Sequence, residues 1–207
     1  MIRPPQISRW FYPDAIWRLN SEKQKTVFIT FDDGPHKSST AELLDILKED
    51  NIDATFFCTG ENCLYYPDLV LEIIKAGHQI GNHGFSHKNG WKTQTSEYIN
   101  DIEKADKIIQ SKLFRPPYGK ISPKQYHILR KKFTIVLWDL LSYDYDASVT
   151  PHKLLKTLIE NTRDGSVIVF HDKPGTIQKL QVVLPEYFSF LKTEGYHASI
   201  LSKNVAI

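Results

Sequence analysis

The chain has 207 residues, of which 41% are hydrophobic, 24% are charged and 12% are aromatic. This is the composition of one globular domain, and with only two cysteines it excludes disordered, collagen-like and disulfide-scaffold proteins. The net charge of +2, without a long basic run, gives no electrostatic footprint for nucleic acid or for an anionic membrane surface.

Residues 1–25 are predicted to form an arm that packs on the bottom of a domain spanning residues 26–207. The arm lacks the apolar segment of ~7–15 residues that a secretory signal has. No run in the chain approaches the ~18 apolar residues of a transmembrane segment. The chain as given is therefore expected to be cytoplasmic. The aromatic residues expected to cover the bottom of the domain are Trp10, Phe11, Tyr12 and Trp17.

Beyond the arm, short apolar runs rich in β-formers alternate with segments of helical periodicity. This alternation predicts a parallel sheet, and runs such as Val27–Ile29, apolar on both faces, indicate that helices cover it. Seven such units fit a barrel better than an open two-sided sheet, and the expected fold is a single α/β domain with a TIM-like (β/α)7 barrel. The predicted strands are Thr26–Asp32, Ala54–Thr59, His78–His83, Leu113–Arg115, Thr134–Leu140, Val167–His171 and Tyr196–Leu201.

Several helix starts have recognisable capping residues. Ser39 with Glu42 fits a capping box. Ser122 and Thr150 each precede a proline, which is favoured at the first helical position. These signals place helices after the first strand and on either side of the fifth.

Titratable residues gather where the apolar runs end. In a parallel barrel all of these ends lie on one face, where active sites are built. Asp139 and Asp172 stand beside them in the sequence and are predicted to lie near the same site. The residues that gather are Asp32, Asp33, His83, His87, Arg115, Asp144 and His171.

Two of these groups indicate a metal. Asp32 and Asp33 would repel each other if buried, and a cation would remove that cost; the alternative is an Asp-Asp-Gly turn that uses Gly34. His83 and His87 are four residues apart and can reach one ion. With one aspartate they form a two-histidine, one-carboxylate set that leaves coordination positions open.

Five segments, in chain order, resemble the five motifs of the polysaccharide deacetylases (the NodB homology domain, carbohydrate esterase family 4). The resemblance covers roughly residues 25–201 and implies a distorted (β/α) barrel, often with seven units. The segments are Thr30–Pro35, Gly81–His87, Arg115–Gly119, Trp138–Tyr145 and Val169–Asp172.

The resemblance also implies roles for single residues. Asp33, His83 and His87 would bind a divalent metal, usually Zn²⁺ and sometimes Co²⁺, Ni²⁺ or Fe²⁺. Asp32 would be the general base and His171 the general acid. Arg115 would pair with the base, Asp144 would tune the acid, and the backbone N–H of Tyr118 would help to hold the oxyanion. The residues expected to contact the substrate are Tyr145, Pro116 and Pro117.

Three positions depart from the family pattern, and they bear on substrate fit more than on activity. Gly84 stands where the family has Ser or Thr. Leu141 replaces an aspartate of the fourth motif, and Tyr145 replaces its tryptophan.

The leading function is removal of N-acetyl groups from a GlcNAc-containing glycan or chitooligosaccharide. An O-acetyl esterase of the xylan type would use the same metal site. Metal-free hydrolysis of cyclic amides is disfavoured by the complete ligand set, and a degenerate, non-catalytic carbohydrate-binding barrel by the retention of Asp32 and His171. The sequence predicts no oligomeric state.

Overall fold

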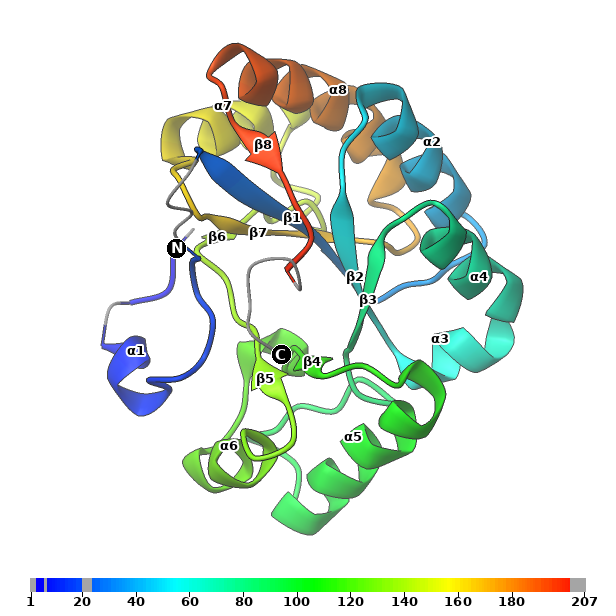
Figure 1. Ribbon diagram of the computed structural model, residues 1–207, viewed down its shortest axis with the longest axis vertical. Helices are drawn as coiled ribbons and strands as arrows, with labels where there is room; N and C mark the ends of the chain where they lie inside the picture. The colour runs from blue at the N-terminus through cyan, green and yellow to red at the C-terminus, as the bar shows by residue number, and fades with distance from the viewer. Residues whose placement is uncertain (1–2, 6, 20–23, 202–207) are drawn as a thin grey trace.

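A computed structural model of the chain describes residues 3–5, 7–19 and 24–201. Seven strands form one curled sheet in the order β5-β4-β3-β2-β1-β7-β6, and all neighbouring pairs are parallel. This half-barrel confirms the predicted single α/β domain with a distorted (β/α)7 fold (Figure 1). The strands are β1 (Thr26–Asp32), β2 (Ala54–Cys58), β3 (Gln79–Asn82), β4 (Leu113–Phe114), β5 (Thr134–Ile135), β6 (Leu140–Leu141), β7 (Val167–His171) and β8 (His197–Ala198), which pairs with the start of β1.

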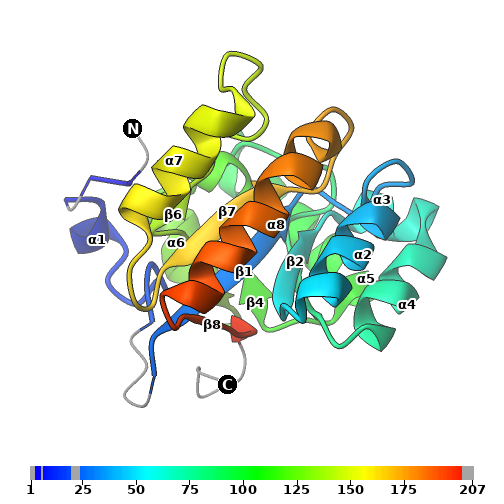
Figure 2. The ribbon, with the colours of Figure 1, turned by 90° about the horizontal axis from the view of Figure 1, so that it is seen from above.

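Helices cover the outside of the curled sheet. Two of them, α7 and α8, run side by side over β7 and β1 (Figure 2). The helices are α1 (Ser8–Phe11), α2 (Thr40–Asp50), α3 (Gly60–Tyr65), α4 (Pro67–Lys75), α5 (Thr95–Ile109), α6 (Pro123–Leu129), α7 (Pro151–Asn161) and α8 (Ile177–Thr193), and a 3₁₀ turn, η1, spans Pro117–Gly119.

Strand β1 shows how the sequence builds both sides of the sheet. All seven of its residues are buried. Because side chains alternate across a strand, Phe31 belongs to the large core under the helices, whereas Phe28 joins the cluster inside the barrel. Thr30 and Asp32 continue the inward series, and Asp32 ends the strand. The apolar interior therefore leads directly to a carboxylate at the mouth of the barrel.

The predicted strand Thr134–Leu140 is wrong as one element, since it forms β5 and β6 with a break between them. The break is where the N-terminal arm inserts. The Ile16 N–H donates to the Ile135 carbonyl (2.8 Å), and the Leu137 N–H donates to the Ile16 carbonyl (2.7 Å). The segment between β5 and β6 thus pairs with the arm, and β6 pairs with β7. The arm lies at the gap between the two edge strands, β5 and β6.

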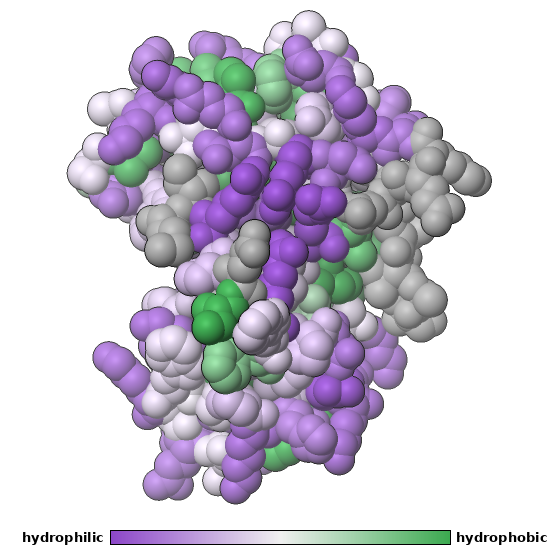
Figure 3. Space-filling model, turned by 90° about the vertical axis from the view of Figure 1, so that its left-hand side faces the viewer, coloured by the Kyte–Doolittle hydropathy of each residue, from purple (hydrophilic) through white to green (hydrophobic). Residues whose placement is uncertain are grey.

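The aromatic residues of the arm differ in their burial. Trp17 is buried, and the half-buried Tyr12 donates its hydroxyl to the Ile121 carbonyl (2.6 Å). Trp10 and Phe11 are exposed, so they do not cover the barrel as predicted. The side of the molecule on which α1 lies presents mainly hydrophilic residues, with small separate hydrophobic areas (Figure 3). In the part of the chain that the structure describes, no helix is both long and apolar enough to cross a membrane.

Two of the three predicted helix caps are confirmed. Ser122 forms a capping box with Gln125, and the Thr150 side chain accepts from the Lys153 N–H. The capping box predicted for Ser39 is wrong. Its side chain makes no bond to the helix and instead donates to a carboxylate, that of Asp172 (2.5 Å).

Candidate active site

The carboxyl ends of the strands enclose a cavity of about 360 Å³. Asp32 ends β1 and His171 ends β7, while His83 and Arg115 directly follow β3 and β4. The predicted convergence of these residues on one face of the barrel is therefore observed. Beyond the titratable residues, the larger side chains of the cavity wall are Tyr118, Lys120, Trp138, Leu141, Tyr145 and Lys173.

Asp33, His83 and His87 come together as a possible metal site. One ligand atom from each lies within 4.8 Å of the others. Nε2 of His87 is 3.1 Å, and Nε2 of His83 is 3.5 Å, from Oδ1 of Asp33. Nδ1 of His83 is 2.8 Å from the Arg115 carbonyl oxygen, which only accepts, so Nδ1 carries the hydrogen and Nε2 keeps a free lone pair. This donor set and its orientation fit a divalent cation such as Zn²⁺.

The backbone at the site is held in an unfavourable conformation. Asp33, His87 and Tyr118 have φ values of 79°, 54° and 59°, in the left-handed region that residues other than glycine seldom adopt. The Asn62 amide donates to the Asp33 carbonyl oxygen (2.8 Å) and helps to hold this turn. Burial alone would raise the pKa of Asp33, but the imidazoles of His83 and His87 beside the carboxylate lower it below the usual range. The carboxylate is therefore ionised, as a metal ligand must be.

Asp32 lies beside this set and forms a buried ion pair. Nη1 of Arg115 is 2.7 Å from Oδ1 of Asp32 and 2.7 Å from the Thr30 hydroxyl. Arg115 is fully buried; burial lowers its pKa, while Asp32 opposes that effect. Removing one partner of such a pair costs about 3–5 kcal/mol. The arginine thus fixes one oxygen of Asp32, and the other, Oδ2, lies 3.9 Å from Nε2 of His83.

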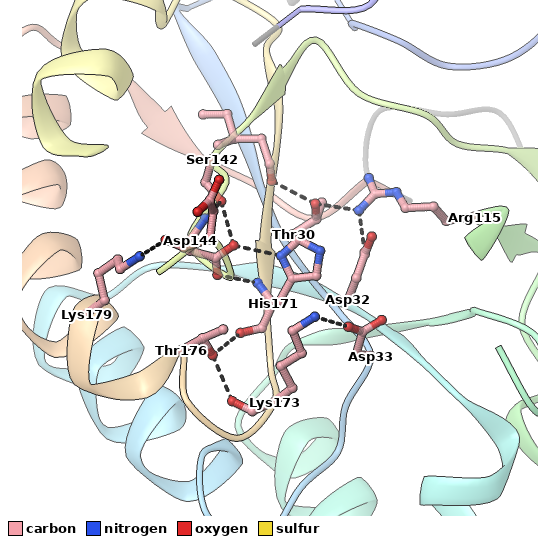
Figure 4. A network of polar contacts seen from close by, with 12 residues as sticks. Thr30, Asp32, Asp33, Arg115, Ser142, Asp144, His171, Lys173, Thr176 and Lys179 are labelled. Carbon is pink, nitrogen blue, oxygen red and sulfur yellow. Dashed lines mark hydrogen bonds and ion pairs between the residues drawn. The ribbon is translucent and has the colours of Figure 1, made fainter. Parts of the chain in front are cut away.

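His171 is held by one carboxylate in two ways (Figure 4). Oδ2 of Asp144 accepts from the His171 backbone N–H (2.8 Å), and Oδ1 lies 2.7 Å from Nδ1. The Ser142 hydroxyl also donates to Oδ1 (2.8 Å). Burial alone would lower the pKa of His171, but the Asp144 carboxylate raises it above the ordinary value. The imidazole therefore keeps its proton to higher pH than a free histidine does.

The residues predicted to contact substrate take different positions. Tyr145 lies on the cavity wall with its ring 4.7 Å from that of His171, and Tyr118 stacks edge-on against His87 at 4.5 Å. The Tyr118 N–H has no acceptor among the described residues. Pro116 and Pro117 are buried and are not among the residues that line the cavity.

One residue that positions the second motif was not predicted. The buried Asp101 on α5 accepts from the Phe85 N–H (2.8 Å) and from the Ser86 hydroxyl (2.5 Å). Gly84 has a φ of +77°, and a Cβ there would lie 3.0 Å from the Asp101 carboxylate. The loop between the two histidines is therefore anchored by a carboxylate from α5. No motif in the sequence points to Asp101.

The two aspartates predicted beside the site have different places. Asp172 is buried behind the first motif, where it accepts from the Thr40 hydroxyl (2.6 Å) and fills the space beside Gly34. Burial raises its pKa to about 6. The placement of Asp139 is wrong. Its N–H donates to the carbonyl of Val167, the first residue of β7, so it lies at the opposite end of the barrel, where it binds Arg163.

The comparison with known proteins agrees with this geometry. A family model described as polysaccharide deacetylase matches residues 20–132, more than half of the chain. The chain belongs to the polysaccharide deacetylase family. Its resemblance to that family, first seen in five short motifs, is thereby confirmed.

Known relatives align with most of this chain, but the chain covers less than two thirds of the length of the first two. It is 37% identical over 181 residues to a peptidoglycan-N-acetylglucosamine deacetylase of Bacillus cereus, covering 82% of the chain and 64% of that relative. It is 29% identical to a bifunctional xylanase/deacetylase of Pseudobutyrivibrio xylanivorans, covering 86% of the chain and 30% of the relative. A crystal structure of a peptidoglycan N-acetylglucosamine deacetylase has a TM-score of 0.88 and 33% identity, covering 97% of this chain and 96% of that one.

Proposed function

We propose that this chain is a metal-dependent N-deacetylase that releases acetate from a GlcNAc-containing glycan. One observation carries the proposal: a metal-ligand set lies in one cavity with a carboxylate tied to arginine and a histidine tied to aspartate. The proposal also draws on the names of the relatives, two of which are peptidoglycan-N-acetylglucosamine deacetylases.

Asp33, His83 and His87 would hold the cation, with Zn²⁺ expected first and Co²⁺, Ni²⁺ or Fe²⁺ as alternatives. When bound, such an ion supplies Lewis acidity toward the acetyl carbonyl and lowers the pKa of nearby water. Oδ2 of Asp32 accepts the proton of the attacking water, because Arg115 occupies Oδ1.

The second half of the reaction needs an acid. As the C–N bond breaks, His171 donates its proton from Nε2 to the leaving nitrogen, while Asp144 holds Nδ1. The Tyr118 N–H is free to donate to the developing oxyanion, a contact worth about 3–4 kcal/mol. The products are acetate and a free amino sugar.

An O-acetyl esterase is the second candidate, and the xylanase/deacetylase among the relatives favours keeping it. The Asp144–His171 pair favours the amide, because an amine leaves only after protonation, whereas an alkoxide needs less help. The same pair, with Asp32, also argues against a binding-only barrel, which has no use for an acid and a base.

The test is acetate release from N-acetylchitooligosaccharides and acetylated xylo-oligosaccharides by metal-loaded protein. We expect faster release from the amide substrate and loss of nearly all turnover in Asp32→Asn, with metal still bound. Thermal unfolding of the variant controls for the loss of the buried pair with Arg115. Near-normal turnover in folded Asp32→Asn would contradict the assignment of the base, and release from the ester alone would favour the esterase.

A further inference from the structure

The two carboxylate oxygens of Asp33 have different partners. Oδ1 lies 3.1 Å from Nε2 of His87 and 3.5 Å from Nε2 of His83, so this oxygen belongs to the candidate metal site. Oδ2 lies 3.2 Å from Nζ of Lys173, a cavity residue two positions after the end of β7 (Figure 4). An ammonium group only donates hydrogen bonds, so Lys173 competes with a cation for Oδ2.

Two features limit where the ammonium group of Lys173 points. Its Nζ lies 5.0 Å from the ring centroid of Tyr145, and an aromatic face within ~6 Å attracts a cation. The backbone is held by the buried Thr176, whose hydroxyl lies 2.8 Å from the His171 carbonyl oxygen and 2.9 Å from that of Lys173. The lysine is therefore placed by contacts other than its ion pair.

The pair differs from an ordinary ion pair on a protein surface. Such pairs contribute little free energy, partly because two long, mobile side chains must be ordered. Here the side chain of Asp33 is short and only 18% exposed, and the Asn62 amide holds its backbone. Ordering the two partners therefore costs less than it does for an exposed pair.

The number of Asp33 oxygens that a cation can reach affects which ion binds. Imidazole nitrogens suit Zn²⁺, whereas carboxylate oxygens suit Mn²⁺. Two imidazoles with a single carboxylate oxygen form a set that favours Zn²⁺. Access to Oδ2 would add an oxygen ligand of the kind that Mn²⁺ prefers.

We propose that Lys173 is a positioning residue that withholds Oδ2 of Asp33 from the cation, so that the site binds Zn²⁺ in preference to Mn²⁺. This inference rests on the metal site of the proposed function and is independent of the identity of the glycan. The ammonium charge also repels any divalent cation, so its removal strengthens the binding of both ions. The ratio of the two affinities therefore isolates the effect of Oδ2.

The test measures both affinities on the purified chain after removal of bound metal. Competition with a chromophoric chelator gives the Zn²⁺ affinity, and the electron paramagnetic resonance signal of the free ion gives the Mn²⁺ affinity. Lys173→Met keeps the apolar stem without the charge. We expect its preference for Zn²⁺ over Mn²⁺ to be about 10-fold smaller than that of wild type, as for other groups that orient metal ligands.

Two further variants separate position from charge. Lys173→Arg keeps a donor for Oδ2 and should retain most of the preference for Zn²⁺. Lys120→Met is the matched control, because it removes an ammonium group that lines the same cavity but lies 5.2 Å from the ring centroid of Trp91. This variant should keep the wild-type ratio.

An unchanged ratio in Lys173→Met overturns the inference, as does an equal fall in Lys120→Met, which would assign the effect to charge alone. Either result leaves the proposed function intact, because wild type still binds its ion. If wild type binds neither Zn²⁺ nor Mn²⁺, the metal site fails, and the proposed function fails with it. Acetate release is not needed for any of these measurements.

Discussion

At His171, two opposing effects set the pKa of the imidazole. Burial lowers it, but the Asp144 carboxylate, 2.7 Å from Nδ1, raises it above the ordinary value. A general acid works only while it is protonated. Activity should therefore be present below this raised pKa and be lost as the pH rises through it.

We predict that Asp144→Asn lowers the pKa of His171, moves the alkaline limb of the kcat profile to lower pH and reduces kcat about 100-fold. The measurement is kcat of the metal-loaded enzyme across the range in which histidine titrates. Asp146→Asn is the matched control, because that exposed carboxylate bonds to Ser148 and not to the imidazole. An alkaline limb at the same pH in Asp144→Asn and wild type would refute the role of Asp144.

At the scale of elements, α5 positions a loop that carries two proposed ligands. Asp101 on α5 accepts hydrogen bonds from Phe85 and Ser86, between His83 and His87. Partners that orient metal ligands usually change metal affinity 10–100-fold when they are removed. The role of this helix is therefore measurable without an activity assay.

Asp101→Asn should lower zinc affinity about 10-fold or more, because the amide cannot accept all of the hydrogen bonds from the loop. Competition with a chromophoric chelator measures the affinity. Asp106→Asn, on the same helix but paired with Lys132, should leave it unchanged. Equal zinc affinity in Asp101→Asn and wild type would show that the loop keeps its conformation without the hydrogen bonds to Asp101.

The sequence was informative where a signal is local or lies at a strand end. Ser122 caps its helix as predicted, and Asp32 lies at the end of a strand with the predicted bounds. Ser39 was misassigned because a local capping pattern cannot reveal a buried carboxylate far along the chain. The break between β5 and β6 was missed for a similar reason, because it depends on pairing with Ile16, which is distant in the sequence. Long-range partners, not local propensity, decided both cases.

For the whole molecule, the arm contributes to closing the barrel. Ile16 pairs with the segment between β5 and β6, and the neighbouring Trp17 is 8% exposed, whereas Trp10 is 84% exposed. Replacing a buried tryptophan with alanine typically costs about 3–5 kcal/mol.

We predict that Trp17→Ala lowers the free energy of unfolding by about 3 kcal/mol or more, and that Trp10→Ala changes it by less than about 0.5 kcal/mol. Urea unfolding of both variants measures the difference. Similar small losses in the two variants would mean that the arm contributes little to the stability of the barrel.

The site as a whole depends on Asp33, His83 and His87 acting together on one ion. The most direct measurement is the zinc content of purified protein after saturation and removal of free metal, compared among wild type, His83→Ala and the exposed-histidine control His152→Ala. The account predicts about one ion per chain in wild type and control, and almost none in His83→Ala. Equal zinc in all three proteins would contradict it.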